Sequence, residues 1–332
     1  MISVRVWQAG WICLLCLGGC AMSPRGASLP ADVAHTLPRA VQLDDTPFFP
    51  QTAYQCGPAA LATVLQAQGI STTPDDLSRG VYLPARKGSL QVEMIAAARR
   101  LQALPYVLEP SFAALLQELA AGNPVLVLQN LGLSVLPRWH YAVVVGYDLD
   151  RQVLVLRSGT LKQRITPVAV FLRTWRRSGQ WALVVLPVGK IPVTANPATY
   201  LRTAHAFEET GMVEQAAAAY RAATKRWPQE ASVWMVSGNM AFATRHTDEA
   251  VADFLTATRL APDDPVAWNN LAYALRDKGC LVEARTAIQC ALHISPDDKN
   301  LRDSRKDMSD GAERKGKPGH CEPVNCTESS LY

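Results

Sequence analysis

The C-terminal half of the chain repeats with a period of 34 residues. In three blocks that start at Pro197, Ala231 and Pro265, five positions carry matching residue types. They are an aromatic residue (Tyr200, Trp234, Trp268), an alanine (Ala216, Ala250, Ala284), a bulky residue (Tyr220, Phe254, Ile288), a second alanine (Ala223, Ala257, Ala291) and a proline (Pro228, Pro262, Pro296). Each block reads as a helical hairpin, because small alanines let two helices approach and proline stops the second helix.

This period predicts tetratricopeptide repeats over residues 197–298, an all-α solenoid. Stacks of such hairpins form a concave groove that commonly binds an extended or helical peptide. A purely structural or oligomerisation arm is the alternative.

In the N-terminal half, Cys56 is placed at a predicted helix start. Residues 58–68 read as a helix, since Pro58 occupies the first helical position and apolar residues follow at spacings of three and four. Unpaired N–H groups and the helix dipole favour an anion there, so we expect a lowered pKa for the Cys56 thiol and a nucleophilic thiolate. A buried structural cysteine is the alternative.

His140 follows 84 residues later and opens a β-branched run that reads as a buried strand. Alone, it would be a hydrogen-bonded histidine at a strand end. Together with Cys56, it fits the nucleophile and base of a thiol hydrolase, residues far apart in sequence and adjacent in the fold. Gly57 would let a substrate approach the backbone, and the Gln51 amide would donate to a developing oxyanion.

Gln51, residues 56–62 and residues 140–147 together resemble the C39 cysteine peptidases, the papain-like group that trims double-glycine leaders from bacteriocin precursors. More narrowly, the chain resembles envelope-associated C39-like proteins that carry tetratricopeptide repeats. The resemblance covers about residues 46–190 and implies an α+β papain-like domain. It implies Cys56 as nucleophile, His140 as general base and Gln51 as oxyanion donor.

Two features depart from that family. Gln51 stands five residues before the cysteine, where six is usual, and Gln55 is a competing amide. The family's third catalytic residue is normally an Asp or Asn on the strand after the histidine, and residues 157–160 of this chain read Arg-Ser-Gly-Thr.

Geometry selects Ser158 for this third position. Asp148 follows His140 on the same strand, but eight strand residues span roughly 26 Å, beyond hydrogen-bond reach. If the strand returns through a tight turn at Leu149 and Asp150, His140 lies opposite Ser158 or its neighbour. We therefore expect the Ser158 hydroxyl to accept from the imidazole and fix its tautomer.

The first 19 residues have the layout of a secretory signal, with basic Arg5, an apolar stretch at 11–17 and small residues before Cys20. The segment resembles a bacterial lipoprotein signal in which Cys20 carries the lipid; an ordinary signal peptide is the alternative. Met22 in place of aspartate implies an outer membrane lipoprotein facing the periplasm. Residues 20–45 are expected to form a flexible linker.

Composition supports two domains with cores of their own: 332 residues, 48% hydrophobic and 19% charged. The net charge of +4 and the lack of a basic cluster interleaved with aromatic residues give no case for nucleic acid. We expect no cofactor or metal. The polar residues 303–332 are expected to be disordered. The pairing of the four late cysteines (Cys280, Cys290, Cys321, Cys326) stays open, with a local Cys321–Cys326 loop among the options.

Two functions follow. The first is an envelope-tethered cysteine peptidase whose repeats recruit a substrate or partner. The second is a non-catalytic adaptor, in which a peptidase-like domain binds peptide beside a repeat scaffold. The missing carboxylate favours the adaptor, whereas the Gln, Cys and His together favour the enzyme.

Overall fold

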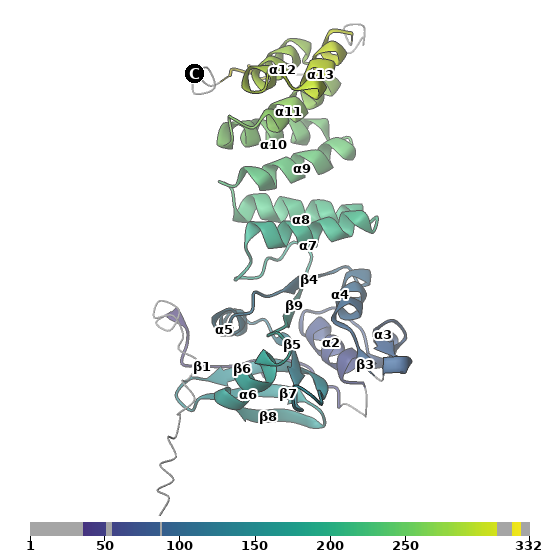
Figure 1. The fold of residues 1–332 in the computed structure, drawn as a ribbon, viewed down its shortest axis with the longest axis vertical. Coiled ribbons are helices and arrows are strands. Elements are labelled where there is room, and N and C mark those ends of the chain that lie inside the picture. The colour runs from purple at the N-terminus through teal and green to yellow at the C-terminus, as the bar shows by residue number, and fades with distance from the viewer. Residues whose placement is uncertain (1–35, 51–54, 87, 311–320, 327–332) are drawn as a thin grey trace, which may run out of the picture.

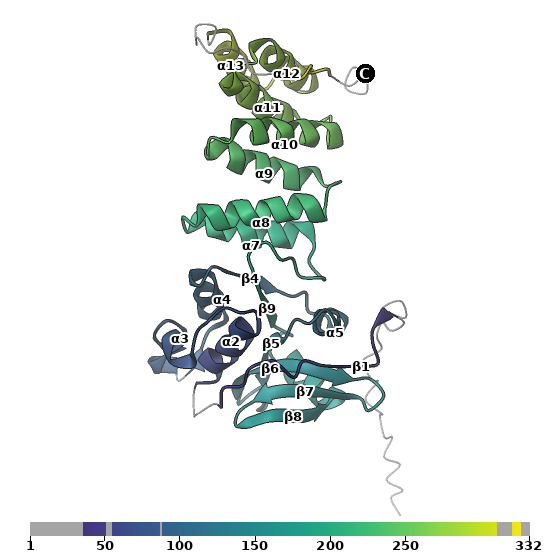
Figure 2. The same ribbon diagram turned by 180° about the vertical axis from the view of Figure 1, so that it is seen from behind.

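The computed structural model describes residues 36–50, 55–86, 88–310 and 321–326. A mixed domain of strands and helices lies at one end, and a stack of helices extends from it (Figures 1 and 2). The α+β domain followed by an all-α solenoid is the predicted architecture.

An antiparallel sheet forms the centre of the first domain, with the strand order β4-β9-β5-β6-β7-β8 and with β1 on the far end of β6. The strands are β1 (Ala40–Gln42), β4 (Ala103–Val107), β5 (Val125–Asn130), β6 (Trp139–Asp148), β7 (Val153–Ser158), β8 (Leu161–Pro167) and β9 (Ala182–Pro187). The predicted linker is therefore too long, because residues 40–42 pair with β6 and Leu37 is buried. A three-residue strand is too short to show an alternating pattern in sequence.

Helices cover both faces of the sheet, which explains the unbroken apolar run of β5. Leu126 and Leu128 face one core, whereas Val125 and Val127 face the other. The first core is covered by α2 (Cys56–Ala67), α3 (Pro74–Val81) and α4 (Gln91–Arg100), and the second by α5 (Phe112–Ala120) and α6 (Val168–Arg176). A small hairpin of β2 (Tyr82–Leu83) and β3 (Gly88–Ser89), with the 3₁₀ turn Pro84–Arg86 between them, packs beside the start of α2.

Three helical hairpins follow at the predicted 34-residue period. They are α7 (Pro197–Glu209) with α8 (Val213–Arg226), α9 (Ala231–Ala243) with α10 (Thr247–Leu260), and α11 (Pro265–Lys278) with α12 (Leu281–Ile294). The aromatic and proline columns are coupled, because the Trp268 indole N–H donates to the Pro262 carbonyl at 2.9 Å and Trp234 repeats the bond to Pro228. Each bond fixes the entry of a hairpin against the end of the preceding one.

The first hairpin shares its core with the α+β domain. Tyr200 and Phe207 of α7 belong to the same buried cluster as Leu104 and Tyr106 of β4. The Asn196 backbone N–H also donates to the Tyr106 hydroxyl at 3.3 Å. Composition suggested two domains with cores of their own, but the two halves share this core. Deletion of residues 197–298 would therefore uncover apolar surface on β4.

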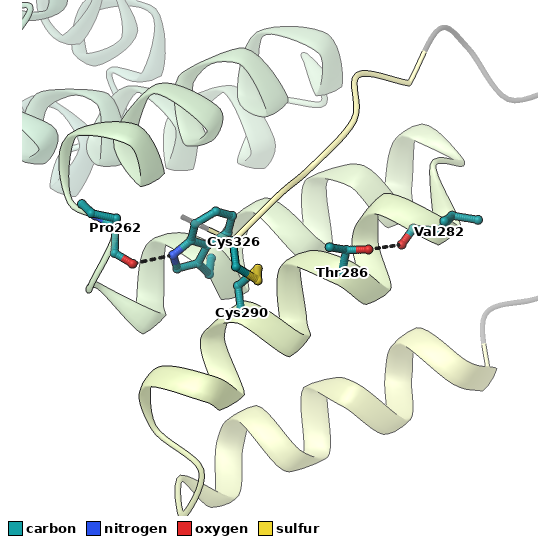
Figure 3. Close-up of a disulfide and its surroundings, with 6 residues drawn as sticks. Pro262, Val282, Thr286, Cys290 and Cys326 are labelled. Carbon is teal, nitrogen blue, oxygen red and sulfur yellow. Dashed lines mark hydrogen bonds between the residues drawn. A yellow bond between two sulfur atoms is a disulfide. The ribbon is translucent and has the colours of Figure 1, made fainter. Parts of the chain in front are cut away.

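The C-terminal segment is ordered where the structure describes it, so the prediction of disorder over residues 303–332 is wrong for residues 303–310 and 321–326. Lys299–Asp310 form α13, which buries Leu301 and Met308 at a spacing of seven. Cys280 pairs with Cys321, and Cys290 of α12 pairs with Cys326 (Figure 3), so a Cys321–Cys326 loop is excluded. The polar composition of this segment predicted disorder, because composition does not show the two disulfides that hold the segment.

No helix within the described ranges is both long enough and apolar enough to cross a membrane.

Candidate active site

Cys56 is the first residue of α2 and is half-buried. Leu61 and Leu65, further along this helix, pack into the core against β6 and hold the cysteine at the sheet. The backbone N–H of Tyr141 points at the Cys56 sulfur and stabilises its thiolate. The sulfur therefore lies against the peptide group that joins His140 to Tyr141.

Gly57 is required by packing, which differs from the role expected from sequence. A Cβ at this position would come within 2.2 Å of the Ser89 Oγ. The β3 backbone is in turn held by the Tyr141 hydroxyl, which donates to the Ser89 carbonyl at 3.2 Å. Glycine at this position thus allows β3 to pack over the start of α2. This packing explains the glycine without any contact to a substrate.

His140 is the second residue of β6, and its Nε2 lies 2.8 Å from the Ser158 Oγ. Ser158 ends β7 and is buried. When Nε2–H donates to the hydroxyl, the Nδ1 lone pair is the one that can take a proton from a thiol. The predicted contact between His140 and Ser158 is present, and their catalytic roles stay predictions.

The pairing of β6 with β7 that brings Ser158 to His140 differs from the expected register. Asp148 pairs directly with Val153, so the turn has four residues, and a bulge between Val144 and Gly146 shifts the pairing again. Asp148 lies at the other end of β6 from His140, as the distance argument required.

Continuing the observed pairing of Val143 with Arg157 places Ser158 opposite Ala142. Ser158 is then the diagonal neighbour of His140, which is within reach of a long side chain. The contact between Ser158 and His140 was therefore predicted correctly, although the turn between their strands was not.

Burial decides the charge state of both groups. It raises the pKa of the Cys56 thiol, and the N–H groups of Tyr141, Gly57 and Cys56 itself offset this only in part. Burial lowers the pKa of His140 to about 4, and the charges of Arg164 and Arg138 lower it further. The lowered thiol pKa expected from the helix start is thus wrong, and both pKa directions favour a neutral thiol and a neutral imidazole in the free protein at pH 7.

Sequence reasoning missed Arg157, which fixes the chain segment before Cys56. This arginine is buried, and its guanidinium donates to the carbonyls of Asp44 and Thr46 at 3.2 and 3.1 Å and to that of Lys162 at 2.5 Å. It ties the segment that leads to Cys56 to the strand that carries Ser158. A single arginine beside Ser158 gives no sequence signal for such a role.

Gln51 and Cys20 fall outside the described residues, so the oxyanion donor and the lipid site stay predictions. Gln55, the competing amide, is the N-cap residue of α2 and makes no side-chain cap bond there. Within the described ranges, the structure gives no hydrogen bond between Cys56 and His140; they meet through the His140–Tyr141 peptide group.

A comparison with protein families bears on this site. Residues 36–183 match the model of the Peptidase_C39 like family, and residues 201–265 and 241–299 match a tetratricopeptide repeat model. The chain carries a C39-like peptidase domain followed by tetratricopeptide repeats. The C39-like match begins at residue 36 and so includes β1, in agreement with the shorter linker.

Solved structures resemble the two parts separately. A putative C39-like peptidase from Bacillus anthracis is 18% identical with a TM-score of 0.38, over 45% of this chain and 98% of that one. The first TPR of Spaghetti (RPAP3) bound to an HSP90 peptide is 15% identical with a TM-score of 0.33, over 35% of this chain and 92% of that one. No curated protein matches the sequence.

Proposed function

We propose that the C39-like peptidase domain is an active thiol peptidase that cleaves a peptide or protein substrate. The observation that carries the proposal is the arrangement at the end of β6: Ser158 bonds the His140 Nε2, and the residue after His140 donates its N–H to the Cys56 sulfur. A buried structural cysteine would need neither an oriented imidazole on the strand that its sulfur contacts nor a place at a helix N-terminus.

The chemistry proceeds from neutral groups. His140 Nδ1 takes the Cys56 proton as the sulfur attacks the scissile carbonyl, which gives a tetrahedral oxyanion and an imidazolium. The Cys56 N–H and the Gln51 amide hold the oxyanion. The imidazolium then protonates the leaving amine, a thioester forms at Cys56, and water hydrolyses it to return the thiol.

The adaptor is the second candidate, because the position of the third catalytic group holds the hydroxyl of Ser158 and not a carboxylate. A hydroxyl fixes the tautomer of His140 but stabilises an imidazolium less well. A hydroxyl in place of a carboxylate slows the proton transfer from Cys56 to His140 without preventing it, so we favour the enzyme.

The location and partners form part of the same proposal. The two disulfides support an oxidising compartment, which the periplasm provides. Acylation at Cys20 would anchor the protein in the outer membrane. The repeats would then recruit a substrate or partner peptide in their groove, beside a peptidase domain that shares a core with the first hairpin.

Comparing protein N-termini in envelopes from cells that make the wild type or Cys56→Ala tests the enzyme against the adaptor. We expect a defined set of N-termini that occurs with the wild type alone, because the variant keeps the fold and loses the nucleophile. Ser232→Ala, at an exposed position of α9, is the matched neutral substitution and should give the wild-type set. If wild type and Cys56→Ala yield the same N-termini while sharing a repeat-dependent partner, the adaptor is correct.

A further inference from the structure

Next to His140, the chain presents an apolar loop to solvent. Residues 131–138 join β5 to β6; together with Trp139, the first residue of β6, they are called the apolar loop. Its large side chains are strongly exposed: Leu133 by 62%, Val135 by 81%, Leu136 by 72% and Trp139 by 56%. Leu161, at the start of β8 beside Ser158, adds another exposed apolar side chain. Soluble surfaces rarely gather so many large apolar groups in one place without a partner.

The apolar loop has a fixed shape. The buried Asn130 accepts from the N–H groups of Gly132 and Arg138, both at 2.9 Å, and Leu131 N–H donates to the Arg138 carbonyl. A Cβ at Gly132 would meet the Leu136 carbonyl oxygen at 2.3 Å, so the tight turn needs glycine. The fold thus holds these apolar side chains outward, although burying them would be favourable.

The part of the domain that carries the loop is rich in basic residues. Residues 125–187 contain eight basic and only two acidic residues, although the whole chain has a net charge of only +4. The two acidic residues, Asp148 and Asp150, lie at the opposite end of β6 and pair with Arg151 and Arg39. Folding therefore assembles at the His140 end a positive charge that the linear sequence spreads out.

Six of these basic residues have no acidic partner among the described residues and are called the cationic rim: Arg138, Lys162, Arg164, Arg173, Arg176 and Arg177. Lys162 and Arg164 lie on the edge strand β8. The C-terminal end of α6 lies against the base of the loop, because the Gln129 amide donates to the Thr174 hydroxyl at 2.6 Å.

We propose that the apolar loop and the cationic rim form a docking surface for an anionic phospholipid bilayer, separate from any anchor at Cys20. Protruding aliphatic side chains with a tryptophan, flanked by Arg and Lys, match the apolar interior and the negative headgroups of such a surface. A peptide groove would cover its lining side chains, whereas Val135 and Leu136 are largely exposed. Docking places the end of the sheet that carries His140 at the membrane surface.

The test uses residues 21–332, which keep every described element and lack Cys20, with vesicles of phosphatidylcholine and phosphatidylglycerol at 3:1 or of phosphatidylcholine alone. We expect sedimentation with the anionic vesicles and binding at least tenfold weaker to the neutral ones. Arg138→Gln and Arg164→Gln should each weaken binding roughly fivefold, the equivalent of about 1 kcal/mol per charge. The joint change Val135→Ser with Leu136→Ser should weaken it at least tenfold.

Matched controls exist on the repeats. Val266 and Val282 are also exposed, as are Arg259 and Arg285, so Val→Ser and Arg→Gln at these positions should leave vesicle binding unchanged. Cys56→Ala should bind vesicles like the wild type, which separates this surface from peptidase activity. Trp139 fluorescence should shift to the blue on binding and be quenched by brominated lipid, and Trp139→Phe should remove that signal.

Several results would overturn the proposal. They are absence of binding to anionic vesicles, equal binding to neutral ones, or equal losses from the control variants. A loop variant that turns a dimer into a monomer and leaves vesicle binding intact would identify a contact between copies. A loop variant that weakens only peptide binding would identify a substrate surface.

Discussion

His140→Ala should slow peptide cleavage by roughly a thousandfold or more, because the neutral imidazole is the base that takes the Cys56 proton. Its Nε2 lies 2.8 Å from the Ser158 hydroxyl, so the ring is already oriented before a substrate binds. The measurement is the hydrolysis rate of a substrate peptide at pH 7. His205→Ala, an exposed histidine on α7, is the control and should leave the rate unchanged.

Substitutions of Ser158 should change the cleavage rate less than His140→Ala does. Because its hydroxyl orients His140 without supplying a charge, Ser158→Ala should slow cleavage by roughly tenfold to a hundredfold. Ser158→Asp should be tolerated, since a carboxylate also accepts from Nε2 and raises the pKa of His140. Equal rates for the wild type and Ser158→Ala would show that another group orients the imidazole.

Alkylation of Cys56 by iodoacetamide should accelerate about tenfold per pH unit from pH 6 to pH 8. Burial raises the pKa of this thiol, so the reactive thiolate is scarce at pH 6 and grows as pH rises towards that pKa. His140, with its pKa lowered to about 4, is uncharged over the whole range and adds no step to the profile.

The matched comparison is Ser158→Asp. Its carboxylate should raise the pKa of His140, favour the imidazolium beside the thiolate and speed alkylation at pH 6 relative to the wild type. A wild-type rate that is already high at pH 6 and flat up to pH 8 would contradict the neutral thiol and support the lowered thiol pKa that was expected at the helix start.

Local patterns predicted the elements that position the candidate site. Proline at the first turn and apolar spacing predicted α2, and the β-branched run predicted β6, so Cys56 and His140 were placed correctly on their elements. Ser158 followed from strand geometry, although the turn was two residues longer than expected. Because Ser158 and His140 are diagonal neighbours, their contact was predicted despite this error in the length of the turn.

What the sequence could not supply depends on contacts between distant segments. The pKa directions of Cys56 and His140 follow from burial, which outweighs the helix N-terminus and is invisible in a local motif. Arg157 acts through carbonyls more than a hundred residues away in sequence. The disulfide partners and the cationic rim likewise arise only when separated residues meet.

The most direct measurement is mass mapping of the folded protein after treatment at pH 7 with an epoxide inhibitor of cysteine peptidases. Within the described ranges, Cys56 is free and the other cysteines are paired in two disulfides. An active thiol peptidase predicts one adduct, on Cys56, that forms at least tenfold faster than in His140→Ala. An adduct that forms equally fast in both proteins, or not at all on Cys56, would contradict an active Cys56–His140 thiol peptidase.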